Sequence, residues 1–285
     1  MNTNVRIVTD STCCLPQEFV DQYEISVLPV GLIIEDKVYR DCIDISLDEI
    51  CRRIEEGKKQ PTTAAVSPGE FVDTFSMLAE SSENIVCILV SKVLTATQES
   101  AYQAKRQIRA KYPDLNIEII DSKTSAGALG FIVAEAARVA QQGKTMAEVI
   151  EIVRDMISRV MYLATLDTLK YLINIGRAPR SGTIGEMLNI KPIIGFVDDT
   201  GTIDVIARVR GKNQSLLKMI GLIGEYIETK PSIHVMVHYS VSREEGEELK
   251  DKINARYKCS ELYITPYSPV MVSATGPMTG ISFYS

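Results

Sequence analysis

The sequence predicts an α/β protein with two domains. Residues 1–159 are expected to form a mainly parallel sheet flanked by helices, and residues 160–285 a mixed α/β domain with an antiparallel hairpin. In the first half, short β-branched runs alternate with helical segments, a pattern that favours parallel pairing through right-handed crossovers. In the second half, two strand-like runs flank a D-D-T-G stretch at residues 198–201, which is typical of a hairpin turn.

Helix caps and strand runs define the first half. S-x-x-E segments begin at Ser46 and Ser67, and such capping boxes satisfy the backbone donors of a helix start. The second has Pro68 at the first helical position, where proline is favoured. The expected strands are 5–9, 25–34 (interrupted by Pro29 and Gly31), 85–90 and 117–121, and the helices are 16–22, two after the caps, one up to Lys111 and 126–142.

The second half changes character. We expect helices at 146–160 and 215–229, one ending at Gly176 and one capped by Ser242, with strands at 162–165, 190–197, 202–208, 233–239, 261–265 and 281–284. No flexible linker separates the two halves. They are therefore expected to pack closely around a shared cleft.

Composition excludes several classes of protein. Hydrophobic residues make up 45% and charged residues 24%, as in ordinary globular proteins. The longest apolar stretches fall short of the roughly 20 residues of a membrane helix, and no apolar signal region follows Met1. We therefore expect a cytoplasmic protein that is not an integral membrane protein. The net charge of −6 gives no support to a nucleic-acid partner.

Polar clusters follow three strands of the predicted parallel sheet, at residues 9–12, 91–92 and 121–124. Open α/β sheets bind ligands at this edge, and helix-start amides can hold an anion there. Ser, Thr and Asp are also good helix caps, which explains any single cluster. Three clusters at equivalent positions leave a ligand cleft and simple capping as equal interpretations.

Catalytic and metal-binding motifs are absent from the sequence. It contains no phosphate-binding loop, dinucleotide fingerprint or nucleophile elbow. The six cysteines lack zinc-ligand spacing, and the adjacent Cys13 and Cys14 are interpreted as packing residues rather than a redox pair. His234 and His238 lie in one predicted strand, roughly 13 Å apart, which is too far for one shared metal. We therefore expect no catalytic residue, metal or cofactor.

Two basic segments form a candidate docking surface for an acidic or phosphate-bearing partner. A solvated rim explains them equally well. Their arginines are Arg177, Arg180, Arg208 and Arg210.

Short segments along almost the whole chain resemble the landmarks of the DegV family, in the same order. They are T-D-S-T at 9–12, P-T-T-A-A-V-S-P-G-E-F at 61–71, S-K-V-L-T-A-T at 91–97, D-S-K at 121–123, L-K-Y-L at 169–172, G-R at 176–177, I-K-P-I at 190–193, R-G at 210–211 and G-P at 276–277. Each segment is unspecific alone, whereas the ordered series is specific.

The resemblance implies two α/β domains that clasp one long-chain fatty acid, with its acyl tail among apolar side chains. By motif, its carboxylate is held by the hydroxyls of Thr63 and Thr95 and the backbone N–H of Ala96. Further candidates near the head group are Thr62, Ser91, Thr275 and Gly276. Family carriers present the acid to a separate ATP-dependent fatty acid kinase, which makes an acyl phosphate for phospholipid metabolism. The resemblance thus implies a non-catalytic carrier, monomeric or dimeric.

The chain departs from the family pattern at the head-group end. Thr95 stands in place of Ser, Ala96 in place of Gly, A-A-V at 64–66 in place of S-Q-P, and Ala274 where the family often has His. These changes imply a more apolar site, with a different acyl length or weaker carboxylate binding. Two other functions stay open: an interaction protein with an altered or empty cleft, and a small-molecule phosphotransferase that uses Asp10 or Asp121.

Overall fold

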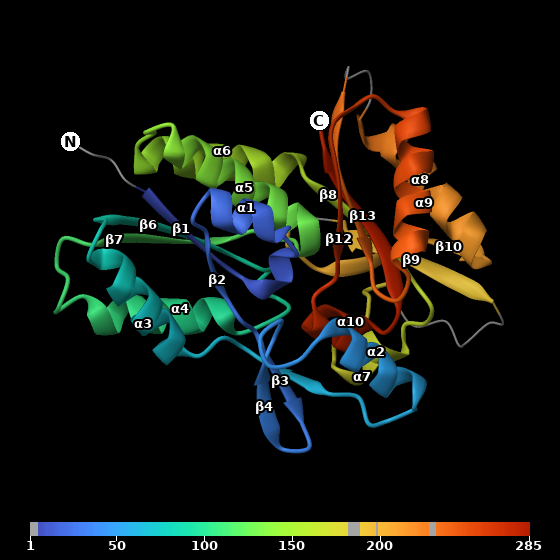
Figure 1. The fold of residues 1–285 in the computed structure, drawn as a ribbon, viewed down its shortest axis with the longest axis horizontal. Helices are drawn as coiled ribbons and strands as arrows, with labels where there is room; N and C mark the ends of the chain where they lie inside the picture. Colours follow the sequence, from blue (N-terminus) through green and yellow to red (C-terminus); the bar gives the residue numbers. More distant parts are fainter. Residues whose placement is uncertain (1–4, 182–188, 198, 228–231) are drawn as a thin grey trace.

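The computed structural model describes residues 5–181, 189–197, 199–227 and 232–285. A four-stranded sheet forms the first half, with strand order β2-β1-β6-β7 and all neighbours parallel, as predicted (Figure 1). Helices α3 and α4 cover one face, and α5 and α6 the other. The elements are β1 (Val5–Asp10), β2 (Ser26–Leu28), β6 (Asn84–Leu89), β7 (Asn116–Asp121), α1 (Gln17–Gln22), α3 (Pro68–Ala79), α4 (Thr97–Ile108), α5 (Ala126–Gln141) and α6 (Met146–Arg159).

A mixed six-stranded sheet forms the second half, in the order β10-β9-β8-β13-β11-β12. Strands β9 and β10 form the predicted antiparallel hairpin, and Asp198 of its predicted turn lies outside the described residues. The elements are β8 (Met161–Leu166), β9 (Ile190–Phe196), β10 (Ile203–Arg210), β11 (Ile233–Tyr239), β12 (Cys259–Pro266), β13 (Met278–Tyr284), α8 (Lys212–Ile227) and α9 (Arg243–Arg256). Helix α8 begins three residues before the predicted start at Ser215, and its predicted end at 229 lies outside the described residues.

Helix α5 is shared by both sheets. It contacts β1 and β6 of the first sheet and β8, β11 and β13 of the second, which explains why most of its residues are apolar and buried. A Cβ atom on Gly127 would lie 2.5 Å from Nε2 of His238, so glycine permits this approach. The Gly127 amide donates to that nitrogen at 3.2 Å. The two halves therefore pack closely.

Short elements join the halves below the sheets (Figure 1). They are β3 (Gly31–Ile34), β4 (Lys37–Arg40), β5 (Thr62–Ala64), α2 (Leu47–Glu55), α7 (Lys170–Asn174) and α10 (Pro269–Thr275). Strands β4-β3-β5 form a small antiparallel sheet, with β3 in the centre. Helix α10 packs against α2, α7 and β5. Sequence analysis did not predict β4, β5 or α10.

The two predicted capping boxes differ in the structure. At α3, Ser67 accepts from the Glu70 amide and Glu70 accepts from the Ser67 amide, so the box is complete. At α2, Ser46 accepts from the Glu49 amide, but the Glu49 carboxylate pairs with arginines of its own helix instead. The prediction of a complete box at Ser46 is wrong, because guanidinium groups compete for the carboxylate.

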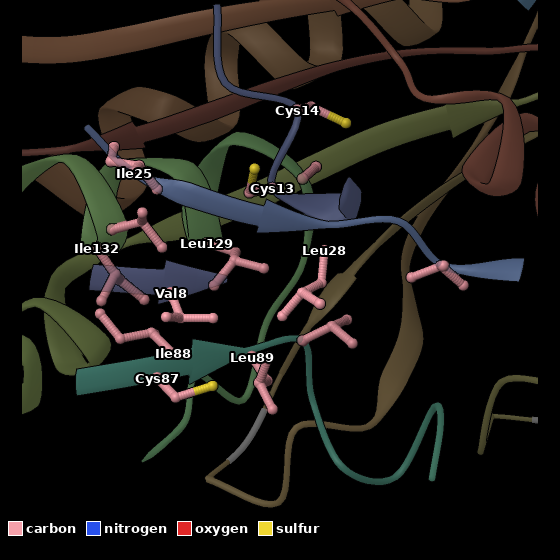
Figure 2. Packing of buried hydrophobic residues seen from close by; sticks show 14 of the residues in the cluster. Val8, Cys13, Cys14, Ile25, Leu28, Cys87, Ile88, Leu89, Leu129 and Ile132 are labelled. Atoms are coloured by element: carbon pink, nitrogen blue, oxygen red, sulfur yellow. The ribbon is translucent and has the colours of Figure 1, made fainter. Parts of the chain in front are cut away.

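Cys13 and Cys14 are buried and belong to the hydrophobic core, as the packing interpretation predicts (Figure 2). Across the described ranges, no helix is long and apolar enough to cross a membrane.

Candidate functional site

A cavity lies between the two halves at the carboxyl edge of the parallel sheet. Its empty space, including the part open to solvent, is about 720 Å³. Most of its lining is apolar. The lining residues are Thr12, Val30, Thr63, Val90, Leu94, Thr95 and Ser125 from the first half, and Leu172, Ile175, Arg177, Ile203, Val270, Met271, Ala274 and Thr275 from the second.

Thr63 and Thr95, the predicted carboxylate donors, both line this cavity. Thr63 comes from β5, where it pairs with Leu32 of β3. Thr95 precedes α4, and its hydroxyl lies 2.9 Å from that of Thr97. The Thr95 hydroxyl also accepts from the Thr97 amide. Two residues distant in sequence therefore line one cavity.

Ala96 is the residue before α4, and its φ of −87° is ordinary for alanine. Its replacement of glycine therefore introduces no backbone strain. Ala96 is not part of the cavity lining, and it is exposed, as is Thr63 of the lining.

The other candidate head-group residues divide into two groups. Thr275 lines the cavity, but its hydroxyl donates within α10 and its C-terminal turn, to the carbonyls of Met271 and Gly276. Thr62, Ser91 and Gly276 are not part of the lining. The Ser91 hydroxyl donates to the Gly201 carbonyl at 2.7 Å, which joins the sheet edge to the β9–β10 hairpin.

The polar clusters at the sheet edge mostly bond to one another. Asp10 is fully buried and accepts from the Thr12 amide and hydroxyl and from the Val90 amide. Asp121 accepts from the amides of Lys92 and Lys123. These carboxylates organise the turns, which agrees with the capping interpretation. The cluster residues that line the cavity are Thr12 and, just beyond the third cluster, Ser125.

The four arginines do not form one patch. Arg177 lines the cavity and donates to the Leu94 carbonyl through Nε and Nη2, at 2.8 and 2.6 Å. Arg180 contacts Thr200, just before β10. Arg208 and Arg210 lie at the other end of that strand, roughly 17–23 Å from its start. Their role in docking stays a prediction.

Asp41, which sequence analysis missed, connects the halves beside the cavity. It is 1% exposed and accepts from the Ser11 hydroxyl at 2.6 Å and from the Val270 amide of α10 at 2.8 Å. Burial raises the pKa of this carboxyl to about 6, although the bonds that it accepts oppose that shift. No local sequence signal marks this contact, because the partner helix is distant in the chain.

The histidines are packing residues, as interpreted from their spacing. Nδ1 of His234 lies 2.7 Å from Glu261, and its ring stacks on Tyr284. Burial lowers the pKa of His238 to about 3, so the ring is neutral. Within the described parts of the chain, no group of three or more metal-ligating side chains could hold a metal ion.

Comparison with known proteins identifies the family. The sequence model described as "Uncharacterised protein, DegV family" matches residues 4–285. The chain belongs to the DegV family. A DegV domain-containing protein of Caldanaerobacter subterraneus is 32% identical over 265 residues, covering 92% of this chain and 90% of that one. Another, from Clostridium perfringens, is 30% identical over 281 residues, covering 98% and 97%.

Solved DegV structures share the fold. A DegV family protein from Thermus thermophilus, described for its fatty acid binding, has a TM-score of 0.91 at 23% identity, covering 99% of both chains. A stearic acid-binding protein from Eubacterium ventriosum has a TM-score of 0.90 at 24% identity and 98% coverage of both. A Ruminococcus gnavus DegV protein with vaccenic acid reaches 0.89 at 21% identity, with 99% coverage of both. The predicted family and fold class are confirmed.

Proposed function

We propose that this DegV protein binds a long-chain fatty acid in the cavity between its halves and presents it to a separate ATP-dependent fatty acid kinase. One observation carries the proposal: Thr63 and Thr95, the motif-assigned carboxylate donors, line the same largely apolar cavity. The fatty acids in the titles of the related structures support the choice of ligand.

The apolar lining accounts for the acyl chain. Burial of about 15 methylene groups contributes on the order of 10 kcal/mol before the costs of association. The carboxylate must be hydrogen-bonded, because an unpaired buried charge is costly. In this proposal, Thr63, Thr95 and the Ala96 N–H supply those bonds.

Arg177 strengthens the case for an anionic head group. Its guanidinium donates only to neutral carbonyls of Leu94 and Ile175 among the described hydrogen bonds, and no described carboxylate forms an ion pair with it. Its positive charge on the cavity wall is therefore not neutralised by an acid of the described residues, and it favours a bound carboxylate.

The exposure of Thr63 and Ala96 supports presentation to an enzyme. A carboxylate held there lies near solvent, whereas the tail lies deeper. A kinase can then reach the reacting oxygen while the apolar chain stays covered.

Denaturing extraction of freshly purified protein, followed by mass spectrometry, tests the ligand. We expect a stoichiometric free fatty acid. No co-purified acyl ligand, together with no uptake of added fatty acid, contradicts the proposal. Incubation of the loaded protein with ATP and a purified fatty acid kinase then tests presentation, with acyl phosphate as the expected product and an unchanged acid as the contrary result.

A further inference from the structure

A second cavity lies beside the first. Its empty space, including the part open to solvent, is about 940 Å³. Residues of both halves line it, among them Cys14, Val20, Val27, Ile43 and Tyr267. Its walls are therefore partly apolar, although no function has been assigned to it above.

Two fixed contacts form part of the wall between the cavities. The Val30 amide, at the first cavity, donates to the Ser11 hydroxyl, at the second, at 3.1 Å. The Val270 amide, at the first, donates to Asp41, at the second, at 2.8 Å. Each involves a backbone amide, so breaking it leaves a buried polar group unpaired. At these points one residue lines each cavity, and a hydrogen bond holds the two residues together.

The third contact is different, because it joins two side chains through sulfur. Sγ of Cys14, at the second cavity, lies 3.6 Å from Sδ of Met271, at the first. The thiol is a weak donor and the thioether a weak acceptor, so little is lost when they separate. Methionine has three rotatable side-chain bonds and readily adopts other rotamers. This is the weakest point of the wall.

We propose that Met271 is a movable partition and that the second cavity accepts the end of an acyl chain too long for the first. The inference rests on the proposed function and specifies it further. Rotation of Met271 away from Cys14 joins the two cavities while the contacts at Asp41 and Ser11 stay in place. The residues that meet the chain end beyond the partition include Val27 and Tyr267.

The proposal predicts how binding affinity depends on the length of the acyl chain. Each methylene that enters an apolar environment tightens binding about fourfold. An acid that reaches the second cavity gains up to this factor for each added methylene, because only part of the lining is apolar. A closed wall instead makes affinity fall once the first cavity is full.

Three variants test the partition. Met271→Ala removes it, and Val27→Phe fills the second cavity without altering the first. Met146→Ala is the matched control, since Met146 begins α6 and lines neither cavity. Each protein is offered an equimolar series of saturated fatty acids of graded length, and native mass spectrometry reports the bound distribution.

We expect Met271→Ala to shift the distribution towards longer acids, and Val27→Phe to lower occupancy by the longest acids at least tenfold with the shorter ones unchanged. Met146→Ala should match the wild type. If Val27→Phe does not fold, as judged from its melting temperature, Val20→Phe on α1 replaces it. Unchanged binding of the longest acids in the filled variant overturns the inference. Failure of the wild type to bind any acid is a different result, which overturns the proposed function and the inference together.

Discussion

The two sides of the central cavity are held in contrasting ways. At the edge of the parallel sheet, Asp10 accepts three hydrogen bonds that fix the turns after β1 and β6. On the opposite side, α10 presents Met271 and Ala274 to the cavity and is held by Asp41 from the first half. One side is fixed by a buried carboxylate that bonds to two turns, and the other is a short helix held by packing and by a few long-range hydrogen bonds.

This contrast suggests that the two sides of the cavity bind different parts of a lipid. A carboxylate needs donors at fixed positions, because hydrogen bonds depend steeply on distance and angle. An acyl chain needs only apolar surface, which side chains such as methionine can rearrange to provide. Thus we expect the sheet edge to determine stability and head-group binding, and α10 to determine which acyl chain fits.

The largest expected effect is at the sheet edge. Asp10→Ala leaves the buried amides of Thr12 and Val90 without their acceptor, so we expect the free energy of unfolding to fall by about 3–5 kcal/mol. Urea denaturation measures the change. Asp73→Ala, on the exposed side of α3, is the control and should change stability by less than about 0.5 kcal/mol. A loss at Asp10 no larger than at Asp73 would show that this network does not stabilise the fold.

The second prediction concerns the attachment of α10. Because burial raises the pKa of Asp41 to about 6 in the folded protein, its contribution is fully present below about pH 4 and is lost as pH rises through 6. Asp41→Asn cannot titrate. The unfolding free energy of the wild type relative to this variant should therefore fall by about 2.5 kcal/mol between pH 4 and pH 7. Urea denaturation measures the unfolding free energy of both proteins across this pH range. If the two change with pH in the same way, the raised pKa of Asp41 is contradicted.

The sequence predicts the sheet edge better than α10, for a physical reason. Elements of the first half carry local signals, such as the Ser67 and Glu70 cap, so their type follows from adjacent residues. Helix α10 has seven residues and no side-chain cap bond, and its anchor Asp41 is 229 positions from Val270. Thr63 and Thr95 were found through family motifs alone, since no periodicity shows that β5 and the segment before α4 share a cavity.

The third prediction compares how the sheet edge and α10 contribute to fatty acid affinity. Thr95→Val keeps the side-chain shape and removes the hydroxyl, so we expect fatty acid binding to weaken about tenfold. Thr275→Val is the matched control, because Thr275 also lines the cavity but its hydroxyl bonds within α10 and its C-terminal turn. Its affinity should change less than about twofold in isothermal titration. Equal losses in both variants would mean that the head group is not held at the sheet edge.

The smallest expected effect is on fatty acid affinity, when a residue of α10 is replaced by one that can bind the carboxylate. Ala274 lines the cavity where the family often has histidine. In Ala274→His, a protonated imidazole beside the carboxylate should tighten fatty acid binding about two- to fivefold at pH 6, since an exposed ion pair contributes up to about 1 kcal/mol. The gain should vanish by pH 8, because the neutral ring carries no charge. Ala274→Gln controls for size, and an equal gain in both variants, or one independent of pH, would show that added bulk rather than charge alters the cavity.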